Sequence, residues 1–113
     1  MRTVWLLRGG DVLASAEVAE SLVDRARGLL GHARYDGALL LLRTRAVHTA
    51  GMQFPLDVAF LDKDLHVLAT TRLRTWSVAL PRRGAAHVLE AQAGAFERWR
   101  LVTGDQVEIR ETS

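Results

Sequence analysis

Cysteine is absent from this chain of 113 residues, and its absence excludes several kinds of chemistry together. Disulfide bonds, thiolate catalysis and cysteine-based zinc or iron–sulfur sites all need that side chain. Long apolar runs are absent too, and none approaches the roughly 18–20 residues that a membrane-spanning helix requires. The apolar run near the N-terminus is too short for a secretion signal. We therefore expect a cytoplasmic monomer with no membrane association and no bound cofactor.

Lysine is nearly absent, with one residue against fourteen arginines, although the net charge is only +2. Residues 37–56 and 65–88 contain arginine but no acidic residue. The arginines of these two segments are Arg43, Arg45, Arg72, Arg74, Arg82 and Arg83. Adjacent in space, they would form a basic patch for an anionic partner. The favoured alternative is that they protect strand edges and loop tips, because no stacking-aromatic motif for nucleic-acid binding accompanies them.

What is present is a series of short apolar runs, separated by turn residues, in a length typical of one domain. Alternating or continuous apolar patterns predict strands over residues 3–8, 12–19, 37–42, 56–62, 65–71, 85–91 and 106–110. Helical spacing predicts helices over 21–30 and 94–100, and residues 73–84 are expected to form a long loop. The pattern indicates an α+β fold, mostly β. We expect one compact domain over residues 1–113, with an antiparallel or mixed sheet or a partly closed barrel and one or two short helices.

An aspartate inside an apolar strand is the most informative residue of the sequence. Asp57 lies within residues 47–62, VHTAGMQFPLDVAFLD, where both faces of the predicted strand are apolar. A buried carboxylate must be paired, hydrogen-bonded or neutral. The favoured interpretation is structural, with Asp57 accepting backbone N–H groups from the turn at 50–52 or pairing with an arginine. Replacing Asp57 by alanine should then cost on the order of 1–3 kcal/mol. The alternative is a catalytic or ligand-binding acid beside His48.

The four histidines do not form a metal-binding motif. His32, His48, His66 and His87 are scattered, and neither an H-x3-5-H nor an H-E-x-x-H spacing occurs. We therefore expect no metal site. His48 is interpreted as a histidine at a strand end whose ring bonds to the neighbouring turn.

Five segments resemble the DUF192 family, an uncharacterised conserved group of bacterial and archaeal proteins. They are residues 16–31, AEVAESLVDRARGLLG; 36–41, DGALLL; 47–62, quoted above; 87–94, HVLEAQAG; and 103–109, TGDQVEI. The resemblance implies a compact, mostly β domain and brings no established activity. Relatives carry either His or Trp at the position of His48, whereas Pro55 and Asp57 belong to both versions. The resemblance thus favours Asp57 over His48 as a functional residue. Many relatives have an export leader that this chain does not show, which is a further basis for expecting a cytoplasmic location.

Three classes of function remain open from the sequence. The favoured one is a non-enzymatic binding or accessory module whose arginines hold a small anionic ligand. Its ligand-binding residues are expected to be His48, Thr49, Met52, Asp57, Arg82 and Arg83. The alternative is a small hydrolase-like enzyme with Asp57 or Glu90 as general base and His48 as its partner. No nucleophile elbow or phosphate loop supports that alternative. Nucleic-acid binding through the arginines is the third possibility.

Overall fold

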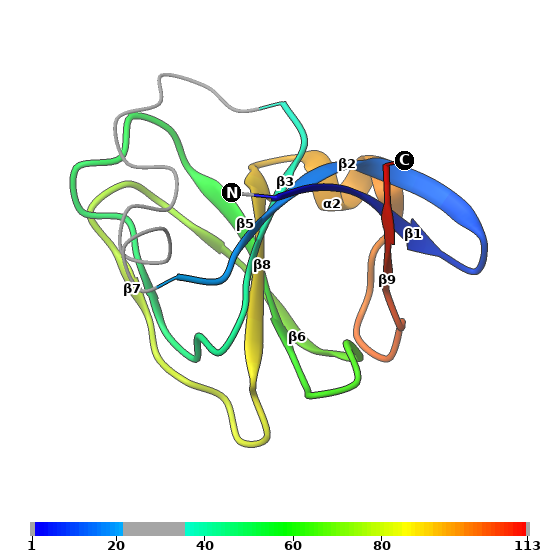
Figure 1. Cartoon of the computed structure of the whole chain (residues 1–113). Coiled ribbons are helices and arrows are strands. Elements are labelled where there is room, and N and C mark those ends of the chain that lie inside the picture. The colour runs from blue at the N-terminus through cyan, green and yellow to red at the C-terminus, as the bar shows by residue number, and fades with distance from the viewer. Residues whose placement is uncertain (1, 22–35, 113) are drawn as a thin grey trace.

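The computed structural model describes residues 2–21 and 36–112, and the helix expected over 21–30 falls outside them apart from Ser21. Within these ranges the chain forms strands and one short helix (Figure 1). In order they are β1 (Arg2–Arg8), β2 (Asp11–Ala19), β3 (Ala38–Leu41), β4 (Val47–His48), β5 (Leu56–Leu61), β6 (Val67–Leu73), β7 (Val78–Ala79), β8 (His87–Gln92), α2 (Ala95–Trp99) and β9 (Glu108–Glu111). The mostly β, α+β class expected from the sequence is confirmed.

Seven of the described strands form one mixed sheet in the order β6-β5-β8-β3-β2-β1-β9. All neighbours pair antiparallel except β2 and β3, which run parallel. The two-residue turn at Gly9 and Gly10 closes the β1–β2 hairpin, and both glycines have positive φ angles of 57° and 87°. A turn with positive φ at both central residues matches the right-handed twist of a hairpin, which explains the glycine pair.

The large sheet separates two hydrophobic clusters, and β5 contributes to both of them. All six residues of β5 are buried, as expected of a strand covered on both faces. Leu56, Val58 and Phe60 belong to one cluster, together with residues of β4 and β7. Ala59 and Leu61 belong to the other, together with residues of β1, β2 and α2. Alternation along β5 therefore puts Asp57 on the face that carries α2.

The two edges of the sheet meet over a few residues only. The backbone N–H of Val67 donates to the carbonyl of Asp105 at 2.7 Å, and that of Gly104 donates to the carbonyl of Val67 at 2.8 Å. One further bond joins the N–H of Val107 to the carbonyl of Leu65 at 3.0 Å. The sheet is thus curved towards a barrel but not closed, because β6 and β9 do not pair along their lengths.

The segment over residues 73–84 differs from the expected irregular loop. It contains β7, which pairs with β4 as a separate two-stranded sheet. Trp76 in this segment is 75% exposed, so its side chain is not an apolar plug that holds the segment against the body of the protein. No helix among the described residues is long and apolar enough to cross a membrane.

Candidate ligand-binding site

Asp57 accepts hydrogen bonds at both carboxylate oxygens. Its Oδ2 accepts the backbone N–H of Gly94 at 2.8 Å and that of Phe96 at 3.1 Å. Its Oδ1 accepts Nε–H of Arg72 at 3.0 Å. The residue is 4% exposed, so these donors satisfy a carboxylate that burial would otherwise penalise. The expectation of a buried, hydrogen-bonded aspartate paired with an arginine is confirmed.

The backbone donors of Asp57 are not those expected from the sequence. The turn that follows Thr49 is closed by its own bond, from the N–H of Met52 to the carbonyl of Thr49 at 3.0 Å. Asp57 binds instead to the start of α2, whose N-cap residue, Gly94, makes no capping bond through a side chain. A carboxylate at a helix N-terminus satisfies free N–H groups there. Asp57 thus caps a helix that begins far along the chain.

Arg72 lies beside Asp57 because β5 and β6 pair directly at these two positions. The hydrogen bond from Nε and the charge of Asp57 raise the pKa of Arg72. Since Nε is used by Asp57, the terminal nitrogens of the guanidinium face outwards, and Nη2 lies 3.6 Å from Oε1 of Glu97. Half of the Arg72 side chain and most of that of Glu97 are exposed. Asp57 therefore orients the guanidinium through Nε, and the terminal nitrogens remain accessible to a ligand.

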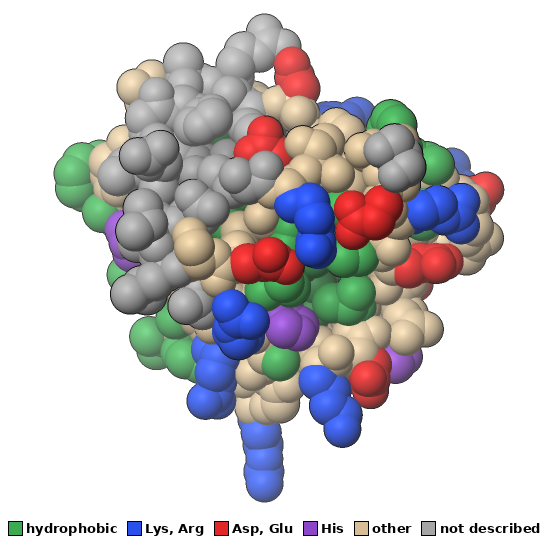
Figure 2. All heavy atoms as spheres, in the orientation of Figure 1, with side chains coloured by type: hydrophobic (Ala, Val, Ile, Leu, Met, Phe, Trp, Pro, Cys, Tyr) green, Lys and Arg blue, Asp and Glu red, His purple; other side chains and the backbone are tan. Residues whose placement is uncertain are grey.

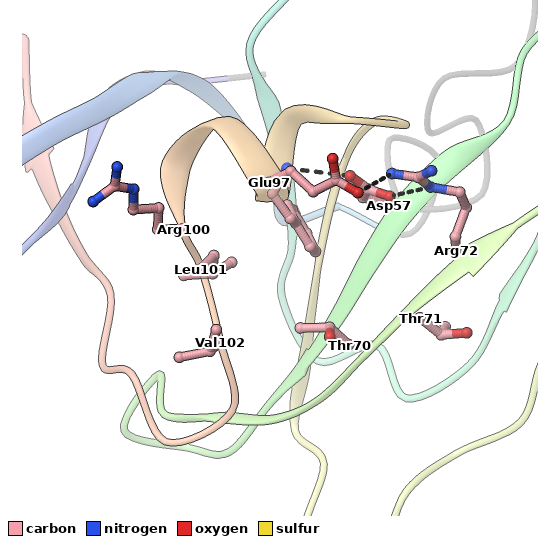
Figure 3. A pocket seen from close by; sticks show the side chains of 9 residues that line it. Asp57, Thr70, Thr71, Arg72, Glu97, Arg100, Leu101 and Val102 are labelled. Carbon is pink, nitrogen blue, oxygen red and sulfur yellow. Dashed lines mark hydrogen bonds and ion pairs between the residues drawn. The ribbon is translucent and has the colours of Figure 1, made fainter.

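A hollow of about 390 Å³ opens next to this charged group (Figure 3). Its lining comes from β6 on one side and from α2 and the segment after it on the other. The lining residues are Asp57, Thr70, Thr71, Arg72, Phe96, Glu97, Arg100, Leu101 and Val102. Figure 3 shows Asp57, Arg72 and Glu97 together at one end, whereas the guanidinium of Arg100 points away from them. Between its ends the hollow is lined mainly by the apolar side chains of Phe96, Leu101 and Val102 and by the threonines of β6, and Arg72 lies at its charged end.

Three of the expected ligand-binding residues lie apart from Asp57. His48 is exposed on β4 in the small sheet, and Met52 is buried in the cluster on the opposite face of β5 from α2. Thr49 is fully buried: its Oγ1 donates to the carbonyl of Arg74 at 2.6 Å and accepts the N–H of Ser77 at 2.7 Å. No hydrogen bond or ion pair of the described residues joins His48 to Asp57. The structure thus does not bring these residues into one pocket.

The remaining expected residues, Arg82 and Arg83, are both exposed near the end of the 73–84 segment. Arg82 lines a second hollow of about 390 Å³, whose other lining residues are Phe60, Thr71, Leu73, Val78, Ala79, Leu80 and Pro81. Thr71 lines both hollows, so they flank β6 on its two faces. Figure 2 shows basic side chains projecting at the lower rim of the molecule, where Figure 1 places the loop that enters β8.

Two further groups of ionisable residues lie outside these hollows. Glu90 on β8 is 4% exposed, and burial raises its pKa to about 7. Asp62, Asp64 and His66 at the β5–β6 turn bring their ligand atoms within 4.8 Å of one another. Backbone N–H groups of His66 and Asp64 bind Oδ1 of Asp62 and lower its pKa. This arrangement accounts for the turn itself. The spacing of the histidines alone gives no sign of this cluster of two aspartates and a histidine, so it was not predicted from the sequence.

Most of the chain matches a known protein family. The model of the DUF192 family, described as an uncharacterized ACR, matches residues 5–109. The chain belongs to the DUF192 family. A UPF0127 protein of Pyrococcus abyssi is 32% identical over 99 residues, which cover 81% of this chain and 83% of that protein. The homologous protein of Pyrococcus horikoshii is 31% identical over 96 residues, with 80% and 84% covered.

Two solved structures share the fold of this DUF192 protein. One, from Sinorhizobium meliloti and described as a candidate transcription regulator, has a TM-score of 0.80 and 25% identity, with 95% of this chain and 92% of that chain covered. The other, from Novosphingobium aromaticivorans, is described as a protein of unknown function. It has a TM-score of 0.76 and 20% identity, with 94% and 83% covered. The family resemblance expected from the sequence is confirmed, and no specific activity comes with it.

Proposed function

We propose that this DUF192 protein is a non-catalytic binding or accessory protein that accepts an anionic group of its ligand at Arg72. The observation that supports the proposal is the pairing of Nε of Arg72 with a buried, fully bonded Asp57. A guanidinium held along one edge keeps its other N–H donors in a fixed direction, which suits recognition of a carboxylate or phosphate. The apolar hollow beside it offers space for the remainder of the ligand.

An enzymatic function with Asp57 as general base fits this arrangement less well. A general base must reach the proton of its substrate, and its lone pairs must be available. Asp57 uses both oxygens for Gly94, Phe96 and Arg72, and His48 lies in the small sheet. We therefore assign Asp57 an orienting role towards Arg72. We further propose that the protein acts as a cytoplasmic monomer, since a chain without cysteine gains no stabilisation from an oxidising compartment.

Replacing Glu97 by glutamine tests the proposed function. Glu97 lies 3.6 Å from Arg72 and competes with an incoming anion for the same guanidinium. We expect E97Q to strengthen the binding of succinate or inorganic phosphate about two- to fivefold, as for removal of one exposed ion pair. The measurement is an NMR titration at constant ionic strength that follows the side-chain Nε–H signal of Arg72.

The control is Glu108→Gln, which makes the same charge change at an exposed position of β9. It should leave the affinity unchanged within experimental error. If neither anion perturbs the Arg72 signal in the parent protein or in E97Q, the assignment of an anion-binding role to Arg72 is wrong. An equal gain in E108Q would mean that only net charge matters.

Nucleic-acid binding is the second candidate, and two observations favour it. Residues 65–88 carry Arg72, Arg74, Arg82 and Arg83 with no acidic residue, and a structural neighbour of 25% identity is described as a candidate transcription regulator. The chain shows no recognised nucleic-acid-binding motif. Retention on heparin that is unchanged when these four arginines are replaced by alanine would contradict this candidate.

A further inference from the structure

The outer edge of β6 has free backbone groups beyond Val67. β6 is the last strand of the large sheet, and β5 is its neighbour on the inner side. Val67 itself bonds outwards to Gly104 and Asp105. Among the described residues, no backbone hydrogen bond reaches the outer side of β6 after that point. An open strand edge is a template for another extended chain.

The alternating hydrogen-bond pattern of β5 identifies which backbone N–H and C=O groups of β6 face outwards. The carbonyls of Pro55 and Leu61 accept bonds from Ala93 and Ala86, on the β8 side of β5. Odd-numbered residues of β5 therefore direct their backbone groups to β8, and even-numbered ones direct them to β6. The strand register pairs the odd-numbered Asp57 and Ala59 with Arg72 and Thr70.

It follows that the N–H and C=O groups of Thr70 and Arg72 point away from β5, to the open side. The register shifts by one residue at Phe60 and Leu61 of β5, so that Ala69 and Val67 are their partners. This bulge explains why Val67 also faces outwards, although it precedes Thr70 by three positions. A chain added next to Thr70 and Arg72 would continue along β6 in the place that residues 104–107 take beside Leu65 and Val67.

The two hollows lie where the side chains of such an added strand would go. Side chains of a strand point alternately to the two faces of the sheet. One hollow lies on the α2 face, with Arg72 at its end, and the other lies on the β7 face, with Arg82 in its lining. Thr71 of β6 borders both. Free backbone groups between two hollows match recognition by strand addition, in which the main chain gives affinity and alternate side chains give specificity.

We propose that the ligand is an extended acidic segment of another protein, added as a strand to the outer edge of β6. This inference rests on the proposed anion-binding role of Arg72. Acidic side chains fit because residues 65–88 hold four arginines and no aspartate or glutamate. The same charges disfavour a second copy of this chain at the edge, since pairing of two β6 strands would bring arginines of the same segment together.

The test measures main-chain pairing apart from charge. The probe is a short fluorescein-labelled peptide that alternates valine with glutamate, and its control is the same peptide N-methylated at every residue, so that neither edge can donate. We expect fluorescence anisotropy to detect binding of the first peptide and at least about a tenfold weaker binding of the second, since several N–H donors are lost. Amide exchange at Thr70 and Arg72, followed by NMR, should slow when the first peptide is bound.

Thr70→Pro and Thr70→Val form a matched pair on the protein side. Proline removes the outward N–H of Thr70 at an edge position where the sheet loses no bond, whereas valine retains that donor and the β-branched shape. T70P should weaken peptide binding about three- to tenfold, and T70V should stay within about twofold of the parent. Binding of inorganic phosphate is measured for both variants as well, so that a loss confined to the peptide is distinguished from a loss of the anion site at Arg72.

Each contrary outcome has a distinct meaning. Equal binding of the methylated peptide overturns strand addition but leaves the anion-binding role intact. Binding of phosphate by a parent protein that binds neither peptide also overturns strand addition and leaves the anion-binding role intact. If the parent protein binds neither phosphate nor the unmethylated peptide, the proposed function itself is contradicted. Slow exchange at Thr70 and Arg72 without peptide, together with a dimer in sedimentation, would identify a second copy as the occupant. Preferential binding of single-stranded DNA over the acidic peptide would identify a nucleic acid instead.

Discussion

Asp57 and Glu90 are buried carboxyl groups on adjacent strands, each 4% exposed, yet their surroundings differ. Asp57 pairs with Ala91 in the β5–β8 ladder, and Glu90 pairs with Val58 one position away. Neighbouring positions point to opposite faces of a sheet. Asp57 therefore faces α2, whereas Glu90 faces the cluster that contains Val58.

The difference between the two faces is the supply of hydrogen-bond donors. On the α2 face a helix begins, and its free N–H groups, together with Arg72, surround the carboxylate of Asp57. No hydrogen bond or ion pair to Glu90 is found among the described residues, and burial raises its pKa to about 7. Equal burial thus has two consequences: a bonded carboxylate stabilises the fold, and an unbonded one retains its proton up to neutral pH.

Removal of the Asp57 side chain should give the largest effect. In D57A the amides of Gly94 and Phe96 lose their acceptor, and Arg72 loses its partner. Each orphaned buried donor costs about 1–3 kcal/mol, and two amides are orphaned here, so the loss in the free energy of unfolding should exceed the range expected from the sequence and reach about 3–4 kcal/mol, measured by urea denaturation. D57N, which retains one carbonyl acceptor, should lose about half as much. An unfolding midpoint of D57A equal to that of the parent would contradict the role of these bonds.

Glu90→Gln should have the opposite sign and should depend on pH. The carboxyl of Glu90 titrates near 4.5 in an unfolded chain and near 7 in the folded protein. Below pH 4.5 it is protonated in both states and the fold retains its full stability. Between pH 4.5 and 7 only the unfolded state gains by releasing the proton, so stability falls, and it stays constant above pH 7.

This difference of pKa corresponds to a loss on the order of 3 kcal/mol between pH 4 and pH 8 in the parent. E90Q should remove most of that loss and should be more stable than the parent at pH 8, although not at pH 4. Urea unfolding at both pH values measures this, with Glu108→Gln, the same change at an exposed position of β9, as the control. Parallel pH profiles of parent and E90Q would show that Glu90 is not the responsible group.

The sequence was sufficient for the burial of Asp57 but not for its partners. Alternating apolar residues around Asp57 predict a covered strand, and β5 is one. The backbone donors come from residues 37 and 39 positions further along the chain, and local spacing carries no information on them. One signal was present: Gly94 opens a short helix with no side chain of its own to cap it. A helix without a local cap, together with the one aspartate that is buried among the described residues, indicates that the two belong together.

The expected ligand-binding set shows the same limit. His48, Thr49 and Asp57 lie close in sequence, and this closeness alone predicts one pocket for them. After Thr49 the buried Met52 and Phe54 stay on the β4–β7 face, and only the alternation along β5 turns Asp57 to the α2 face. The hydroxyl of Thr49 bonds to Arg74 and Ser77 instead. Arg72, which the structure places against Asp57, was identified only as part of a charged segment. Arg72 lies beside Asp57 because β5 and β6 pair at these two positions. The register of that pairing is set by the β5–β6 turn and by the bulge.

Arg72→Lys should give the smallest effect and tests whether the geometry of the guanidinium matters. Lysine keeps the positive charge opposite Asp57. It lacks the planar fork of arginine, which bonds to Asp57 through Nε and presents its two terminal nitrogens outwards. Because half of the Arg72 side chain is exposed, we expect a loss of at most about 1 kcal/mol in stability. Binding of succinate should weaken more than the stability does, by about tenfold, since a bidentate contact becomes a single point charge. If R72K binds succinate as the parent does, charge alone explains the site, and the orientation imposed by Asp57 has no role in recognition.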